Sequence, residues 1–200
     1  MLKELKQGVL FTVVMMVMVG GLYHAVLWGI GRIVFPDRAE GSLIRRQDGT
    51  VVGSSLIAQK FTRHEYFHPR PSAVDYDAAS TGGSNYGPSN PVHLKGLQER
   101  LDAVMALEGV AASEVPSEMV TASGAGMDPH IPPRAAALQA RRVAAARKVD
   151  LTRVEALIGT HTEAPALGIL GRARVNVLQL NLALDDVFGP VHGTLDTASK

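Results

Sequence analysis

Apolar residues fill the chain from Gly8 to Gly31 without a single Asp, Glu, Lys or Arg, and Lys3, Lys6 and Arg32 border this run. At about 1.5 Å per residue, a helix of these roughly 24 residues reaches about 36 Å, enough to cross a hydrocarbon core of about 30 Å. Lipid offers the backbone no hydrogen-bond partners, so only a helix suits such a segment. The pattern therefore predicts a transmembrane anchor over residues 1–35.

A cleaved signal peptide is the alternative interpretation of this run, and it would make the mature protein soluble. Signal peptides have an apolar core of about 7–15 residues and a small-residue cleavage site. The run here is longer, and residues 24–28 contain no A-x-A pattern. We therefore predict an uncleaved anchor, with Tyr23 and Trp28 near the lipid headgroups. Flanking charge does not predict the orientation, because long domains translocate largely regardless of charge.

Beyond the anchor, residues 36–188 are expected to form one mixed α+β domain outside the membrane, long enough to bury a core of its own. Two stretches rich in Pro, Gly, Ser and Asn, residues 66–91 and 111–133, predict long loops within this domain. Residues 189–200 are expected to be a frayed tail. The predicted fold class is α+β, with a single N-terminal transmembrane helix.

Hydrophobic periodicity places the elements of this domain. Two strand-like runs, 42–46 and 50–57, flank Gln47, Asp48 and Gly49, and an Asp-Gly pair in this position predicts a β-hairpin. Helices are predicted where apolar residues recur at helical spacing behind capping residues such as Asn90 and Asp150. They cover 91–109, 134–149 and a short stretch that starts at 150–152 and ends at Gly159. A final strand is predicted to include Val175, Val177 and either Leu178 or Leu180.

Composition narrows the function classes. Twenty Lys and Arg against nineteen Asp and Glu give a formal charge of +1, with the basic residues scattered. Nucleic-acid binding needs concentrated positive charge, so no nucleic-acid partner is expected. Cysteine is absent, which excludes disulfides and thiolate metal sites. Only 5% of the residues are aromatic, so the core is expected to be mainly aliphatic.

His64, Glu65 and His68 form a literal HExxH pattern, which suggests a zinc hydrolase. That chemistry requires a helix, because two imidazoles at i and i+4 must share one face with the Glu acting as general base. Pro69 follows His68 directly, and Pro71 prevents continuation of a helix. No third ligand stands in a matching context, so no metal site is predicted. A membrane-anchored zinc hydrolase remains the alternative function.

Other catalytic patterns are incomplete. Gly124 and Gly126 suggest a phosphate-binding loop, but Pro129 occupies the place of the third glycine in GxGxxG. Ser123 lacks the flanking glycine of a nucleophile elbow. We therefore predict no catalytic residue, and residues 123–133 are interpreted as a structural turn rich in backbone hydrogen bonds.

Small residues recur every fourth position in the anchor, at Gly21, Ala25 and Gly29. Such a stripe allows a neighbouring transmembrane helix to approach closely. His24 lies beside it, and an ionisable residue at membrane depth is a functional candidate or a hydrogen-bond donor to a partner helix. The stripe predicts a partner-helix contact.

Three motifs, in this order behind a single anchor, resemble one known family. They are Tyr66-Phe67-His68-Pro69-Arg70-Pro71-Ser72-Ala73 with Gly82-Gly83-Ser84-Asn85 and Gly87-Pro88-Ser89-Asn90-Pro91; Val120-Thr121-Ala122-Ser123-Gly124 with Met127-Asp128-Pro129-His130-Ile131, Gln139, Arg142, Val143 and Arg147; and Val175-Asn176-Val177-Leu178 with Leu180-Asn181-Leu182-Ala183-Leu184-Asp185. The chain up to about Asp185 is similar to the C subunit of the Kdp-type high-affinity potassium-transporting ATPase.

The resemblance implies a non-catalytic accessory subunit that stabilises an ATP-driven potassium import complex. Its implied partners are a channel-like potassium-binding subunit, a P-type ATPase pump subunit and a small single-helix subunit. The resemblance also implies a catalytic chaperone that raises the ATP affinity of the pump subunit, in a bacterial inner membrane. The large domain is expected on the outer, periplasmic face. ATP is cytoplasmic, so a domain on that face would act on it through other subunits.

The resemblance also suggests site residues. By analogy with a proposed ATP-binding stretch of the family, Gln139 is the candidate nucleotide contact, together with Ser123 and Gly124. No tightly bound cofactor is expected, and ATP would act through the pump subunit. The loop that carries Gly82, Gly83, Ser84, Asn85 and Asn90 is expected to contact the channel-like subunit, because loops on a rigid scaffold commonly supply recognition surfaces. An independent ATP-binding protein is a third possibility.

Overall fold

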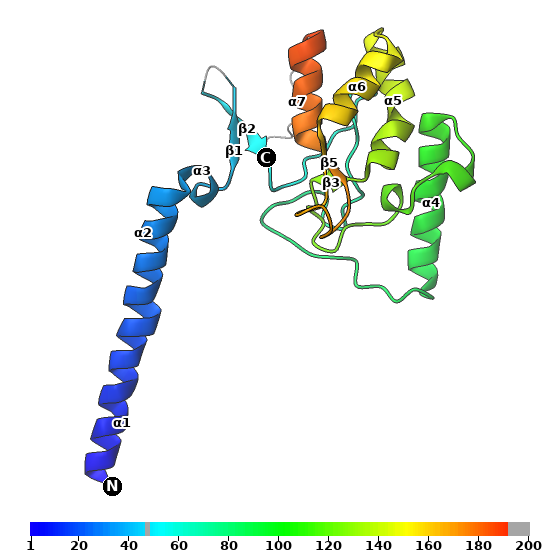
Figure 1. The fold of residues 1–200 in the computed structure, drawn as a ribbon. Helices are drawn as coiled ribbons and strands as arrows, with labels where there is room; N and C mark the ends of the chain where they lie inside the picture. The colour runs from blue at the N-terminus through cyan, green and yellow to red at the C-terminus, as the bar shows by residue number, and fades with distance from the viewer. Residues whose placement is uncertain (47–48, 192–200) are drawn as a thin grey trace. The chain divides into compact units, whose positions relative to one another are not determined.

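The structure of the chain, a computed structural model, describes residues 1–46 and 49–191. It divides into two compact units, which are Met1–Leu43 and the chain from Ile44 onward (Figure 1). The predicted turn residues Gln47 and Asp48 lie outside the described residues. So do residues 192–200, which make up most of the predicted tail.

The first unit is mainly one long helix. Its parts are α1 (Leu2–Met15), η1 (Met16–Tyr23) and α2 (His24–Val34), followed by the short α3 (Pro36–Ala39). Among the described residues, Leu2–Val34 is the one helix long and apolar enough to cross a membrane, and none of it is buried within the protein. The middle part has the wider π-helical turns, and the His24 Nδ1 lies 2.8 Å from the Val19 carbonyl, five residues back. The predicted apolar helix at the N-terminus is confirmed.

The predicted hairpin strands lie where the first unit ends and the second begins. β1 (Leu43–Arg45) and β2 (Val51–Ser54) are neighbours in a two-stranded sheet. The Arg46 amide donates to the Thr50 carbonyl at 2.9 Å, which closes the connection. Both strands are shorter than the sequence pattern suggested. The described chain then has no helix or strand until Pro91, which confirms the long loop.

Three predicted helices are present, and two of them have their predicted side-chain caps. They are α4 (Pro91–Glu108), α5 (Pro133–Arg147) and α6 (Leu151–Thr160), and the one-turn η2 (Ala112–Glu114) and η3 (Ser117–Met119) lie between the first two. Asn90 accepts the backbone N–H of Val92 at 2.9 Å, and Asp150 accepts that of Thr152 at 2.8 Å. Gly109, with φ of 68°, ends α4 in the left-handed conformation that glycine adopts readily.

The predicted C-terminal strand is largely wrong. Only Arg174–Asn176 is a strand, β5, and the chain continues as the helix α7 (Val177–Phe188). The Asn176 side chain caps this helix by accepting the Gln179 N–H at 3.1 Å. Val177, Leu180 and Leu184 are buried on one side of the helix at helical spacing. A short apolar run fits both periods, and here the cap and the packing select the helix.

A three-stranded antiparallel sheet has the order β3-β5-β4, with β3 at His130–Ile131 and β4 at Thr162–Glu163. Ile131 faces Val175 across one pair, and Thr162 faces Val175 across the other. Each outer strand has only two residues, too few to produce an alternating pattern. The sequence pattern therefore did not predict them.

The core lies where α5, α6 and α7 pack side by side, with α4 beside α5 at the edge of the domain (Figure 1). Its buried side chains are mainly aliphatic, as predicted, with Phe67 and Tyr66 as large aromatic members. Four alanines of α5 are buried, at 135, 136, 140 and 144. Small side chains on this face let neighbouring chain segments approach the helix closely.

Candidate functional site

Residues 64–68, the segment with the HExxH pattern, form an irregular stretch of backbone rather than a helix. Tyr66 is 2% exposed and Phe67 is fully buried. Backbone polar groups buried outside helices and sheets need other partners. In this segment the Tyr66 N–H donates to the Arg63 carbonyl at 3.2 Å, and the carbonyls are bound by side chains from α5 and α7.

Two side-chain amides bind the backbone of consecutive residues. Asn181 of α7 accepts the Phe67 N–H at 2.8 Å and donates to the Phe67 carbonyl at 2.9 Å. Gln139 of α5 accepts the His68 N–H at 2.7 Å and donates to the His68 carbonyl at 3.1 Å. Both amides are fully buried. They replace the paired bonds that a neighbouring strand would supply.

Two arginines of α5 bind the carbonyls that precede this stretch. Arg147 donates to the Glu65 carbonyl at 2.8 Å and to Asp185 of α7 at 2.7 Å, and its guanidinium lies 4.9 Å from the Tyr66 ring centroid. Arg142 donates to the carbonyls of His64 and Tyr66. Side chains thus bind every backbone carbonyl from residue 64 to 68. We call this segment with its binding side chains the clamped segment.

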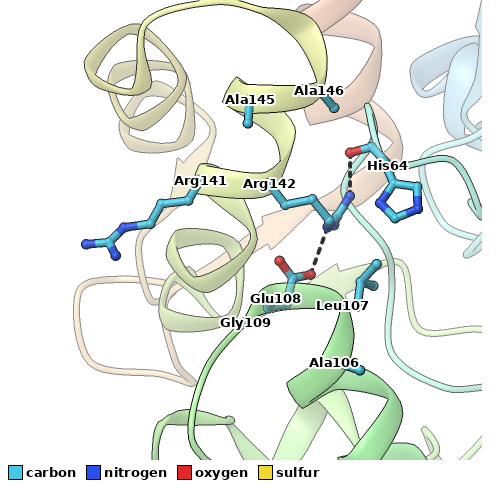
Figure 2. Close-up of a pocket in the computed structure, with 9 residues that line it drawn as sticks. All are labelled: His64, Ala106, Leu107, Glu108, Gly109, Arg141, Arg142, Ala145 and Ala146. Atoms are coloured by element: carbon cyan, nitrogen blue, oxygen red, sulfur yellow. Dashed lines mark hydrogen bonds and ion pairs between the residues drawn. The ribbon is translucent and has the colours of Figure 1, made fainter.

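An open cavity of about 570 Å³ adjoins the clamped segment between the end of α4 and the C-terminal half of α5. Figure 2 shows Arg142 reaching from α5 toward Glu108 and the His64 backbone, whereas Arg141 points away. Arg142 donates to Glu108 at 2.9 Å, with the two side chains 6% and 1% exposed. Burial raises the pKa of Glu108, and the charge of Arg142 opposes that rise. The other Glu108 oxygen, Oε2, is buried without a partner among the described residues.

The zinc-hydrolase alternative is not supported. The His68 Nε2 lies 3.0 Å from the Arg63 carbonyl, so this ring nitrogen is already occupied. His64 is exposed, and the non-helical backbone does not place the two rings on one helix face. The parts of the chain that the structure describes contain no group of three His, Asp or Glu side chains that could hold a metal ion.

His68 is expected to make the folded protein lose stability in acid. Burial, and then the positive charge of Arg142, lower the pKa of His68 from 6.5 to about 4. Because the folded state favours the neutral ring, this contribution to stability is complete above pH 6.5 and is lost as the pH falls toward 4. We expect a loss of up to about 3 kcal/mol, measured as the unfolding free energy of the purified chain in denaturant from pH 8 to 4.

The variant His68→Asn isolates this effect, because it removes the ring and should flatten that part of the pH profile. The exposed neighbour His64 provides the control: its charge is the smallest of the effects on the pKa of His68, so His64→Gln should change the profile far less than His68→Asn. Equal pH dependence in the wild type and in His68→Asn would contradict the assignment.

The structure places the candidate nucleotide contact Gln139 inside the core. Its amide oxygen also accepts a bond from Arg142 at 2.8 Å, and its amide nitrogen lies 3.6 Å from the sulfur of Met119. Both ends of the amide are therefore engaged within the protein. A nucleotide could reach Gln139 only if the clamped segment opened.

Ser123 and Gly124 lie in a turn near the loop predicted to contact a partner. Ser123 is 4% exposed, and its amide donates to the Pro71 carbonyl at 3.1 Å. The Gly82 amide donates to the Ala125 carbonyl at 3.1 Å, and a Cβ on Gly83 would lie 2.7 Å from the Gly124 carbonyl oxygen. The structure thus places the candidate nucleotide contacts Ser123 and Gly124 next to the predicted partner loop. At Gly83 the close backbone contact requires a glycine.

The rest of the predicted partner loop is at the surface. Ser84 and Asn85 are exposed, and Asn85 adopts φ of 53°. Asn90 is partly buried, because its side chain caps α4. In the anchor, Gly21 lies in η1, whereas Ala25 and Gly29 lie one turn apart in α2. A Cβ on Gly21 or Gly29 would meet no other atom within 4 Å.

Asn181, Arg142 and Arg147 were not singled out as site residues from chemical patterns, although they belong to the motifs that carry the resemblance. One local signal exists for Asn181, which is the polar residue in the apolar run from Leu180 to Leu184. A polar residue at a buried helical position indicates a required hydrogen bond.

Comparison with known proteins gives consistent matches along the chain. Residues 5–186 match the family model KdpC, described as "K+-transporting ATPase, c chain". The chain belongs to the KdpC family. A relative from Geobacter sulfurreducens named "Potassium-transporting ATPase KdpC subunit" is 48% identical over 92% of this chain and 98% of its own length. Relatives with the same name from Gemmatimonas aurantiaca and Caldanaerobacter subterraneus subsp. tengcongensis are 45% and 46% identical, over 94% and 91% of this chain and 94% of each relative.

KdpC membership agrees with the resemblance drawn from the three motifs, and the match includes both the anchor helix and the clamped segment. The family is that of a subunit of a potassium-transporting ATPase. The helix Leu2–Val34 is consistent with a membrane location for this KdpC chain.

Proposed function

We propose that the chain is a non-catalytic accessory subunit of an ATP-driven potassium import complex, which stabilises the assembly and raises the ATP affinity of the pump subunit. Family membership is the observation that carries this proposal. The clamped segment adds support, because Gln139, Asn181, Arg142 and Arg147 all bind the protein's own backbone. Their role in the fold is to hold a rigid domain rather than to perform chemistry.

The proposed partners are a channel-like potassium-binding subunit, the P-type ATPase pump subunit and a small single-helix subunit. The stripe of Gly21, Ala25 and Gly29 supports a helix contact in the membrane, because it is open on the isolated chain. Exposure of Ser84 and Asn85 supports a second contact through the loop at residues 82–90.

We further propose a bacterial inner-membrane location with the domain on the periplasmic face. ATP would then act through the pump subunit, and no direct contact by Gln139, Ser123 or Gly124 would be needed. Burial of the Gln139 amide and of Ser123 favours this indirect route. Calorimetry of the full chain with ATP should show no tight binding, which separates this function from that of an independent ATP-binding protein.

Gly29→Leu is expected to weaken co-purification of the chain with its partner subunits several-fold, because a large side chain blocks close approach of a second helix. The measurement is recovery of the assembled complex from detergent, together with the KM for ATP of the recovered ATPase. Gly8→Leu is the matched control, since Gly8 is equally open but lies outside the stripe. Unchanged recovery with Gly29→Leu would contradict the stripe. Full ATP affinity in a complex that lacks the chain would contradict the chaperone role.

A further inference from the structure

The connection between β4 and β5 carries large apolar side chains into solvent. Leu167, Ile169 and Leu170 are 87%, 83% and 58% exposed, and none belongs to the core cluster. The backbones of Ala166 and Leu170 exchange two hydrogen bonds of 2.9 Å, which makes residues 165–171 a narrow hairpin tip. We call these residues the apolar tip.

The backbone of the apolar tip is unusual for the side chains that it carries. Leu167 has φ of 55° and is followed by Gly168 with φ of 77°. Glycine and asparagine occupy the left-handed region with little strain, whereas leucine does so rarely. An aliphatic side chain at this position therefore opposes the local turn preference and also remains exposed. Neither the fold nor the turn requires it, which points to a surface that another apolar phase covers.

Two arginines, Arg172 and Arg174, follow the apolar tip directly in the sequence. Arg174 pairs with Glu163 at 2.8 Å, whereas Arg172 forms no ion pair with a carboxylate in the described part of the chain. Both line a cavity of about 350 Å³ together with Arg70, His130, Asp128 and Glu118. Arg70 donates to Asp128 at 3.3 Å, and its Nε is buried without a partner among the described residues. The base of the tip thus has guanidinium groups that can donate hydrogen bonds beside the apolar side chains. Asp128 and Glu118 are the negatively charged side chains at the same cavity.

We propose that the apolar tip inserts into the interfacial region of an anionic phospholipid bilayer, with Arg172 binding lipid phosphate. A stable protein interface takes about 20–30 residues on each side, far more than the seven of the tip. A narrow projection of Leu and Ile can enter acyl chains without a matching groove, and flanking arginine is attracted to anionic headgroups. The anchor of the same chain keeps the domain near a bilayer, so a small contact is effective.

Tryptophan fluorescence of the full chain in phospholipid vesicles tests this proposal. The chain has one tryptophan, Trp28, which is first replaced by phenylalanine. Ile169→Trp then reports on the tip, and Leu56→Trp is the matched control because Leu56 is also an exposed turn residue, at 61%. In phosphatidylglycerol vesicles with brominated acyl chains, quenching at position 169 should exceed that at position 56 by at least about twofold, as expected for insertion.

Two further variants separate the parts of the proposal. Leu167→Asn suits the left-handed backbone, so the fold should persist while quenching of the reporter at position 169 falls. Arg172→Gln should reduce quenching in phosphatidylglycerol but not in phosphatidylcholine. Quenching that is independent of lipid charge would overturn the headgroup contact. The proposal would be overturned if brominated lipid did not quench the tryptophan at position 169. If assembly with other subunits then protected this tryptophan from quenching by iodide, the apolar tip would be a protein interface.

Discussion

Replacing Arg142 with alanine is expected to lower the unfolding free energy of the domain by about 3–5 kcal/mol, because the change leaves a buried carboxylate without its partner. The Glu108 side chain is 1% exposed, and its second oxygen already lacks a partner among the described residues. The same substitution removes the donors to the carbonyls of His64 and Tyr66. One side chain thus joins α4, α5 and the clamped segment. Denaturant titration of the purified full chain measures the loss.

Arg141→Ala is the matched control for this experiment. Arg141 lines the same cavity but is exposed, so its loss should change the unfolding free energy by no more than about 0.5 kcal/mol. The double variant Arg142→Met with Glu108→Met should recover part of the stability, since no charge is then left buried. A single Arg142→Ala variant as stable as Arg141→Ala would show that the ion pair contributes nothing to the fold.

Asn181→Ala is expected to cost about 4 kcal/mol, since it leaves the N–H and the C=O of Phe67 unbonded in the core, at about 1–3 kcal/mol for each group. Phe67 and Asn181 are both fully buried, so water cannot easily replace the amide. The clamped segment should loosen first, because Asn181 provides its hydrogen bonds to α7 at Phe67. Hydrogen exchange of the Phe67 and His68 amides, together with the unfolding free energy, measures the effect.

Gln179→Ala provides the control on the same helix, because Gln179 is exposed and only its backbone N–H is used, by the Asn176 cap. The pair of variants Asn181→Ala and Gln139→Ala should be non-additive, as both amides bind the same stretch of backbone. Full protection of the Phe67 amide in Asn181→Ala would mean that the clamp does not depend on this side chain.

These two predictions concern the motifs on which the family resemblance is based. Residues from three distant parts of the sequence meet at the clamped segment. They are Tyr66, Phe67, His68, Gln139, Arg142, Arg147, Asn181 and Asp185. The motifs thus share a structural cause, which is the need to bind a buried stretch of irregular backbone. Loops such as residues 82–90 are then presented from a rigid domain.

Local patterns predicted well wherever one physical signal acted alone. The uninterrupted apolar run specified the N-terminal helix, and the capping residues Asn90 and Asp150 marked the starts of α4 and α6. Local patterns failed where two periods compete. Val175 and Val177 alternate as in a strand, yet the chain turns helical at Val177 because Asn176 caps it and the helical face is buried.

The sequence by itself determined the long apolar N-terminal helix, the α+β class, most helix boundaries and the family, because these follow from local hydropathy, local capping and ordered motifs. The tertiary structure alone decided that the HExxH segment is a clamped backbone rather than a metal site, and that Gln139 is buried. It also decided that the two-residue strands β3 and β4 pair with β5. The clamp depends on side chains about 70 to 120 residues from the backbone that they bind, as with Gln139 and Asn181, and no local pattern encodes a partner at that separation.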